Sequence, residues 1–149
     1  MILADEAATA RLGAAIAAKL QAGEAVCLSG PLGAGKSTLA RALVRALTTP
    51  DEDVPSPTFT LVQFYEGERL DVAHFDLYRL ASPDEAYEIG LDEALDDGAA
   101  VIEWPERLEG DLPPDRLDIV IEPAEDAAGR RVRLTPHGAW EGRGLEFGP

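Results

Sequence analysis

The sequence is poor in the side chains that bind soft metals or form disulfides. It contains 1 cysteine, Cys27, and 2 histidines, His74 and His137. A lone cysteine cannot close an internal disulfide, and these side chains are too few for a zinc cage of the usual Cys/His kind. We therefore expect any bound metal to be a hard cation held by oxygen ligands. Cys27 is interpreted as a buried apolar filler and His74 as a strand residue, and neither is assigned a functional role.

Long uncharged runs are also missing. The longest covers residues 54–65, whereas a membrane-spanning helix needs about 20 apolar residues. The chain opens with the acidic residues Asp5 and Glu6 instead of the basic residues that begin a signal peptide. These features predict a cytoplasmic protein that does not enter a membrane.

Positive charge is scarce. Lysine and arginine number 13 against 28 acidic residues, which gives a net charge of −15. Such a surface repels polyanions, so we expect RNA to be reached only through a partner protein. Lys19 and Lys36 are the only lysines in a chain that otherwise uses arginine. A specific role for a lysine is therefore worth testing.

The hydrophobic pattern predicts one α/β domain over residues 1–149. This length suits a single domain, and 46% apolar residues are enough for a packed core. The predicted elements are a helix at 5–21, a strand at 25–29, a helix at 37–47, a loop at 50–57, a hairpin of strands at 58–65 and 70–76, short helices at 83–89 and 91–95, and strands at 99–102, 117–121 and 131–134. Residues 136–149 are predicted to form an irregular tail.

A glycine-rich segment follows the first predicted buried strand. Residues Gly30 to Ser37 match the phosphate-binding pattern G-x-x-x-x-G-K-[ST], between a strand and a helix as that motif requires. Its glycines let backbone N–H groups surround phosphate oxygens, and the helix N-terminus adds its positive dipole end. Lys36 can reach the β- and γ-phosphates, and the Ser37 hydroxyl can bind Mg²⁺. A glycine-rich structural turn is the alternative, but the flanking elements favour nucleotide binding.

A magnesium site also needs a carboxylate, usually at the end of an apolar strand in the same sheet. Glu103 follows the apolar run 99–102, and Asp76 follows residues 72–75. We expect both to lie at the sheet edge where ligands collect, with Glu103 the better metal ligand. For either residue the alternative is a solvated or capping carboxylate, since the chain has 28 acidic residues.

Some further polar and aromatic side chains are candidates for regulation or partner contact. Ser56, Thr58 and Thr60 lie beyond the glycine-rich segment, where other P-loop proteins carry a hydroxyl that senses the γ-phosphate. Ordinary β-propensity explains the two threonines equally well. Trp104 precedes Pro105 and is either a core aromatic or a surface contact for a partner.

Five sequence blocks occur in a fixed order over residues 9–107. They are Thr9-x-x-x-Gly13, the P-loop followed by Thr38, Ser56-Pro57-Thr58-Phe59-Thr60-Leu61-Val62, His74-Phe75-Asp76-Leu77-Tyr78-Arg79-Leu80, and Ile102-Glu103-Trp104-Pro105-Glu106. With these blocks the chain resembles the TsaE family, also called YjeE, and the two middle runs are specific to that family rather than to P-loops at large. It departs from the family at Pro31, where aspartate is usual, and at Ser37, where threonine is usual.

This resemblance implies a P-loop NTPase-like three-layer α/β sandwich with a central, mostly parallel sheet and a β-hairpin. It also implies a magnesium-dependent ATPase that acts with the partner proteins TsaD and TsaB in threonylcarbamoylation of the adenosine beside the tRNA anticodon. The residues it assigns are Thr9, Gly33, Ala34, Gly35, Lys36, Ser37 and Thr38 for ATP binding, Ser37 and Glu103 for Mg²⁺, and Lys36, Asp76 and Glu103 for catalysis.

Other nucleotide-dependent functions can be weighed on the same residues. A GTPase needs N-K-x-D to recognise guanine, and the sequence contains no asparagine. A small-molecule kinase needs an arginine-bearing lid over its second substrate, and the segment before Glu103 is short and acidic. A regulatory binding module, in which ATP orders the loop at 50–57 without fast turnover, differs from an ATPase mainly in rate.

Overall fold

The computed structural model describes residues 1–31, 33–55, 61–124 and 129–144. Its elements in chain order are β1 (Ile2–Leu3), α1 (Glu6–Lys19), β2 (Ala25–Ser29), α2 (Lys36–Leu47), β3 (Val62–Tyr65), β4 (Val72–Asp76), α3 (Pro83–Glu88), α4 (Leu91–Asp97), β5 (Ala99–Glu103), the 3₁₀ helix η1 (Pro105–Leu108), β6 (Arg116–Pro123), β7 (Arg130–His137) and the 3₁₀ helix η2 (Gly138–Trp140). The short strand β1 is an addition to the predicted set. None of the described helices is long and apolar enough to cross a membrane.

The described strands form one seven-stranded sheet in the order β1-β7-β6-β2-β5-β4-β3. The central strands β6, β2, β5 and β4 run parallel to one another. Antiparallel strands complete both edges, where β7 pairs with β6 and β1, and β3 pairs with β4 in the predicted hairpin. Because neighbouring parallel strands end at the same edge of a sheet, the carboxyl ends of β2, β4 and β5 meet.

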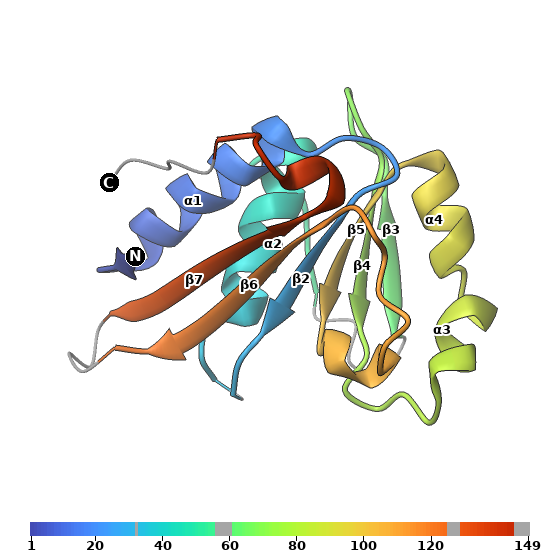
Figure 1. The fold of residues 1–149 in the computed structure, drawn as a ribbon. Coiled ribbons are helices and arrows are strands. Elements are labelled where there is room, and N and C mark those ends of the chain that lie inside the picture. The colour runs from blue at the N-terminus through green and yellow to red at the C-terminus, as the bar shows by residue number, and fades with distance from the viewer. Residues whose placement is uncertain (32, 56–60, 125–128, 145–149) are drawn as a thin grey trace.

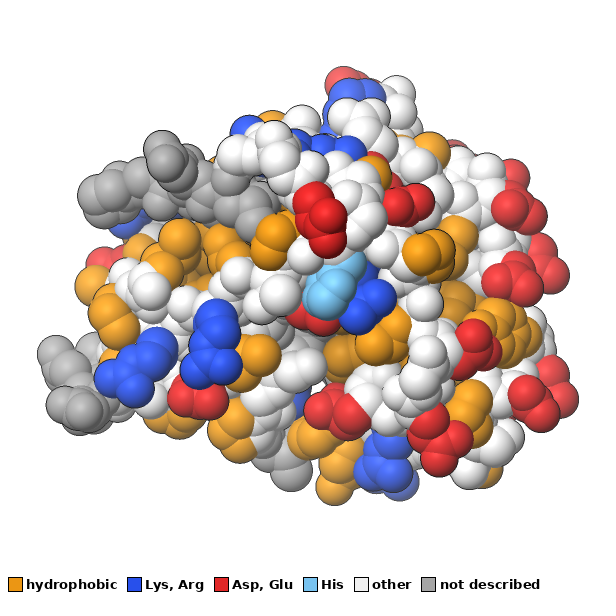
Figure 2. Space-filling view, viewed as in Figure 1, with side chains coloured by type: hydrophobic (Ala, Val, Ile, Leu, Met, Phe, Trp, Pro, Cys, Tyr) orange, Lys and Arg blue, Asp and Glu red, His pale blue; other side chains and the backbone are white. Residues whose placement is uncertain are grey.

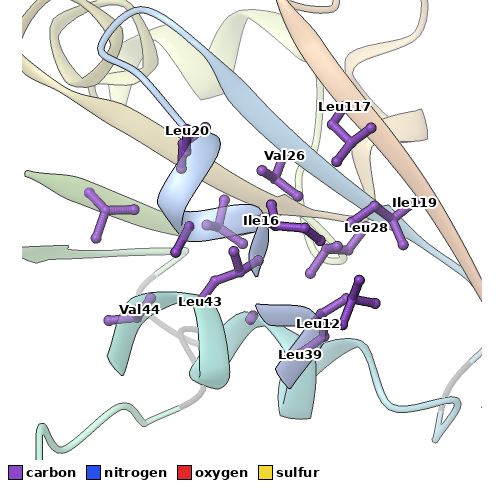
Figure 3. Packing of buried hydrophobic residues seen from close by; sticks show 14 of the residues in the cluster. Leu12, Ile16, Leu20, Val26, Leu28, Leu39, Leu43, Val44, Leu117 and Ile119 are labelled. Atoms are coloured by element: carbon purple, nitrogen blue, oxygen red, sulfur yellow. The ribbon is translucent and has the colours of Figure 1, made fainter. Parts of the chain in front are cut away.

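Helices cover both faces of this sheet, so the molecule has three layers (Figure 1). On one face α1 and α2 pack over the sheet, and Figure 3 shows Ile16 of α1 and Leu43 of α2 beside Val26 and Leu28 of β2. On the other face α3 and α4 pack over small strand side chains such as Ala100. The predicted three-layer α/β fold with a parallel centre and a hairpin is confirmed.

The strand β2 shows how a short sequence serves both layers. Side chains alternate between the two faces of a strand, so Val26 and Leu28 join the core under α1 and α2. Ala25 and Cys27 join the core under α3 and α4. The strand is therefore buried on both faces, which explains its nearly continuous apolar sequence.

Cys27 is expected to be unreactive in the folded protein. Burial, with a smaller contribution from Asp118, raises the pKa of its thiol to about 12. Only the thiolate attacks thiol reagents, so at neutral pH this shift lowers the reactive fraction about a thousandfold, before steric exclusion is counted. Labelling with a maleimide should be slow under native conditions and fast in denaturant. Because Cys27 is the only cysteine, mass spectrometry reads the outcome directly, and rapid native labelling would contradict the buried position.

The expectation of an irregular tail from Pro136 is wrong for residues 136–140. Strand β7 continues to His137, and η2 follows it to Trp140, whose side chain is fully buried. Arg143 then makes two hydrogen bonds of 2.7 Å to the carboxylate of Glu24 and lies over the Trp140 ring. The turn pattern of the sequence hid this anchor, because burial of the tryptophan depends on residues far away along the chain.

Candidate active site

The glycine-rich segment joins β2 to α2 at the carboxyl edge of the sheet. Gly30 has φ of +144°, and a Cβ at this position would overlap the carbonyl oxygen of Ile121. Gly35 is the N-cap residue of α2 and has φ of +107°. Both positions require glycine because side chains disfavour this backbone conformation. The resulting turn starts α2 immediately after the segment, so the N–H groups of its first turn, which an α-helix leaves without an intrahelical partner, lie at the site.

The ammonium group of Lys36 lies inside this turn. Lys36 is only 5% exposed, and its Nζ donates a hydrogen bond to the carbonyl oxygen of Gly30. The same Nζ lies 3.5 Å from the centroid of the Trp104 ring, within cation–π range. Burial lowers the pKa of the Lys36 ammonium, while the charges of Glu103, Glu106 and Asp76 oppose that shift. The Lys36 ammonium is thus held against the loop where a phosphate group would need charge neutralisation.

Oxygen donors converge beside this lysine. The hydroxyl of Ser37, in the first turn of α2, donates a 3.0 Å hydrogen bond to Oε1 of Glu103. Glu103 ends β5 and is 2% exposed. Asp76 ends β4, is buried, and stands opposite Glu103 in the parallel register. The structure therefore brings the hydroxyl and both predicted carboxylates to one edge of the sheet.

This donor set fits a magnesium ion. A serine hydroxyl and carboxylates are hard oxygen ligands, which Mg²⁺ prefers. Within the described residues there is no group of three or more His, Cys, Asp and Glu side chains placed to hold a metal by itself. An ion at Ser37 and Glu103 would therefore take its other ligands from water and from nucleotide phosphates, as Mg²⁺ commonly does.

His74 belongs to this cluster, although the sequence analysis gave it no role. Its Nε2 lies 2.6 Å from Oε2 of Glu103, and both side chains are almost completely buried. His74, like Asp76, lies on the α2 face of β4, because the two residues are separated by one full strand period. The pairing of β4 with β5 then sets His74 diagonally opposite Glu103. The alternation of side chains along β4 already places His74 on the same face as Asp76. Its contact with Glu103 could be predicted only by knowing that β5 is the neighbouring strand.

The residues assigned to ATP binding lie along the loop and the adjoining helices. Thr9 of α1, Thr38 of α2 and Gly35 line one small cavity together with Arg130 of β7. The Thr9 hydroxyl donates a 3.4 Å hydrogen bond to the carbonyl of Asp5, so it is held at the start of α1. Arg130 is a neighbour of the loop that the sequence pattern did not indicate. These contacts extend the site from the phosphate loop toward α1.

The middle of the loop has two further assigned residues. Gly33 has φ of +79°, with open space where a Cβ would stand. Ala34 is fully buried, and its N–H donates a 3.2 Å hydrogen bond to the carbonyl of Pro31. The candidate switch residues Ser56, Thr58 and Thr60 lie outside the described residues.

Trp104 is half-buried beside the site, so it is neither a fully buried core aromatic nor a fully exposed surface residue. It has φ of +59°, which turns the chain from β5 into η1. Its ring packs on Tyr78 with centroids 4.9 Å apart, and Arg107 lies over the Tyr78 ring. Together with Lys36, these side chains form a stack at the rim of the loop, and Tyr78 remains 38% exposed.

Comparisons with known proteins agree on one family. The model of the family "Threonylcarbamoyl adenosine biosynthesis protein TsaE" matches residues 3–132. A TsaE protein of Aquifex aeolicus is 40% identical over 136 residues, covering 90% of this chain and 93% of its own. A TsaE protein of Rickettsia felis is 37% identical over 122 residues, covering 82% of this chain and 71% of its own.

A solved structure gives the same answer for the fold. The crystal structure of Bacillus subtilis YdiB is similar with a TM-score of 0.75 and 30% sequence identity, and the match covers 95% of this chain and 87% of that one. The region matched by the family model, residues 3–132, contains the glycine-rich loop, Lys36 and the Ser37–Glu103 contact. On this evidence the chain belongs to the TsaE family of threonylcarbamoyl adenosine biosynthesis proteins.

Proposed function

We propose that this protein binds ATP with Mg²⁺ and hydrolyses it in the service of tRNA threonylcarbamoylation. The observation that carries the proposal is the contact between the P-loop hydroxyl of Ser37 and the buried Glu103, beside the enclosed ammonium of Lys36. A hydroxyl, a strand-end carboxylate and a lysine at a glycine loop are the parts that P-loop NTPases use on nucleotide phosphates. Membership of the TsaE family supplies the biological setting.

Each side chain has a separate task in this proposal. Loop N–H groups and the start of α2 bind phosphate oxygens, and Lys36 neutralises charge on the β- and γ-phosphates. Ser37 and Glu103 hold Mg²⁺, which when bound would stabilise the charge that develops on those phosphates. Asp76 orients a water molecule for attack or accepts its proton. The N–H of Tyr78 donates a 3.1 Å hydrogen bond to Oδ1 of Asp76, which fixes that carboxylate.

The partners in this proposal are TsaD and TsaB, and tRNA is contacted only through their complex. The chain has a net charge of −15, and acidic side chains crowd the surface over α3 and α4 in Figure 2. Those helices carry acidic residues and no lysine or arginine, so this face repels tRNA. The same lack of arginine argues against a lid of the kind that small-molecule kinases use.

We expect the isolated protein to hydrolyse ATP slowly and the complex with TsaD and TsaB to raise the rate at least about tenfold. A partner surface would position the water or the loop predicted at 50–57, of which the structure describes residues 50–55. Phosphate release should be measured for this protein alone, with each partner, and with both. The control is Lys36→Ala in the full complex, which should remove the stimulated rate.

Two results would change this proposal. Fast turnover by the lone chain would remove the need for partners to complete the site. No turnover in the complex, with assembly still dependent on nucleotide, would identify a regulatory binding module instead. In the same assay tRNA without TsaD and TsaB should not alter the rate, and a filter assay should detect no tRNA binding by this chain at physiological salt.

A further inference from the structure

His74 is a buried polar side chain that the proposed reaction does not itself use. It lies in the middle of β4, is 1% exposed, and has a strand residue on either side. A polar group so deeply buried costs free energy unless a hydrogen bond compensates it. The imidazole makes one such contact, the 2.6 Å contact between its Nε2 and Oε2 of Glu103. Its Nδ1 has no hydrogen-bond partner within the described residues.

The chemistry of the pair fixes which atom donates. As a magnesium ligand the Glu103 carboxylate is ionised and can only accept hydrogen bonds, so the hydrogen between Nε2 and Oε2 is then carried by the histidine. An imidazole has two possible tautomers, and this contact selects the one with hydrogen on Nε2. The unpartnered Nδ1 is consistent with that choice, because a ring nitrogen without hydrogen is an acceptor that tolerates a missing partner better than a buried N–H does.

Both oxygens of Glu103 are consequently held in place. His74 binds Oε2, and the Ser37 hydroxyl binds Oε1 at 3.0 Å. A carboxylate on a flexible side chain can rotate about its terminal torsion, which is broad. The two contacts come from different elements, β4 and α2, so together they fix the plane of the carboxylate relative to the phosphate loop.

We propose that His74 is a positioning residue that orients Glu103, and through it the Ser37 hydroxyl, for binding of magnesium nucleotide. This inference rests on the proposed function, because it gives His74 a task in that same metal site. Partners behind a metal ligand commonly contribute about tenfold to a hundredfold to metal affinity. His74 acts through Glu103 and does not touch the nucleotide or the ion.

A set of substitutions at position 74 tests whether a hydrogen-bond donor is needed at the place of Nε2. The amide nitrogen of glutamine falls close to the place of Nε2, whereas that of asparagine falls close to the place of Nδ1. We expect His74→Ala and His74→Asn to require about tenfold to a hundredfold more Mg²⁺ for half-maximal ATP binding. His74→Gln should restore most of that loss. The measurement is a titration of ATP binding with Mg²⁺, followed by calorimetry, with thermal unfolding to verify that each variant folds.

The matched control is a second histidine that pairs with a carboxylate away from the site. His137 lies 2.9 Å from Asp118 through its Nε2 and is about one-third exposed. His137→Ala removes a histidine–carboxylate pair of the same kind, and the Mg²⁺ requirement should not change. A loss of stability alone would not separate the glutamine variant from the asparagine variant at position 74.

A second measurement needs neither nucleotide nor metal. The ¹⁵N NMR signals of the His74 imidazole in the wild-type protein report which ring nitrogen carries hydrogen. We expect the Nε2–H form, with a Nε2–H proton protected from exchange. If His74→Ala and His74→Asn do not fold, this spectrum still tests whether Nε2 is the donor to Glu103. The His74→Gln titration still tests whether an amide donor at that place preserves the Mg²⁺ requirement.

The outcomes separate this inference from the function on which it rests. Absence of any Mg²⁺-dependent ATP binding by the wild-type protein would overturn the proposed function. Normal Mg²⁺ dependence in the wild type and an unchanged requirement in folded His74→Ala would overturn the positioning role alone. A wild-type imidazole with hydrogen only on Nδ1, or equal Mg²⁺ requirements for the Gln and Asn variants, would also overturn it.

Discussion

Lys36→Ala is expected to lower affinity for magnesium ATP by more than about a hundredfold. The ammonium would make charge-assisted hydrogen bonds to the β- and γ-phosphates, each contributing about 1.5–3 kcal/mol. Losing both costs about 3–6 kcal/mol, and 1.4 kcal/mol corresponds to a factor of ten in affinity. The fold should survive, because burial already disfavours the charged form of this side chain, as its lowered pKa indicates. Calorimetry with ATP measures the effect, and circular dichroism verifies folding.

Two comparison variants make this result specific. Lys36→Met keeps the length and apolar stem of the side chain beside Trp104 but removes the charge, so it should bind as weakly as the alanine variant. Lys19→Ala changes the other lysine of the chain, in the last turn of α1, and should bind ATP normally. Unchanged affinity in a folded Lys36 variant would show that the loop does not bind phosphates in the proposed way.

Glu103→Gln and Asp76→Asn should have different effects although the two carboxylates end neighbouring strands in register. Glutamine keeps the shape of Glu103 but removes its charge from the proposed metal site, so the Mg²⁺ requirement for ATP binding should rise at least as much as in His74→Ala, by about a hundredfold. Asparagine at position 76 removes a proton acceptor, so it should lower turnover about a hundredfold or more with little change in affinity. Binding titrated with Mg²⁺ and single-turnover hydrolysis in the partner complex measure the two quantities.

A half-buried carboxylate on β6 provides the control for this pair. Asp118→Asn removes an acidic charge that pairs with Arg116 and His137, away from the loop, and should change neither quantity. The assignment of Glu103 to the metal fails if both site variants lose turnover and neither alters the Mg²⁺ requirement. The assignment of Asp76 fails if its variant loses affinity as strongly as it loses turnover.

The sequence by itself determined the features that depend on neighbouring residues along the chain. The loop from Gly30 to Ser37 was predictable because backbone conformation, helix start and phosphate chemistry are all encoded within a few consecutive positions. The buried strands that end in Asp76 and Glu103 were predictable because continuous apolar runs are typical of parallel sheets. Parallel strands also end at one edge, so the sequence could place both carboxylates near the loop.

Tertiary structure alone decided which side chains face each other. His74 looked like an ordinary strand residue until the pairing of β4 with β5 set it beside Glu103. Strand alternation gives the face on which a residue lies, but neighbours in a sheet come from segments far apart in sequence. Likewise β1 forms only by pairing with β7, and a two-residue strand has no periodicity of its own.

The C-terminal segment is a second case in which contacts between residues far apart in the sequence decided the structure. Its prolines and glycines indicated an irregular tail, yet Trp140 is fully buried and Arg143 pairs with Glu24. Both contacts span more than a hundred residues of sequence or depend on a core built elsewhere, so no local pattern could reveal them. Local sequence chemistry thus determined the phosphate loop and the strand ends, whereas long-range packing decided the orientation of Glu103 and the anchoring of the chain end.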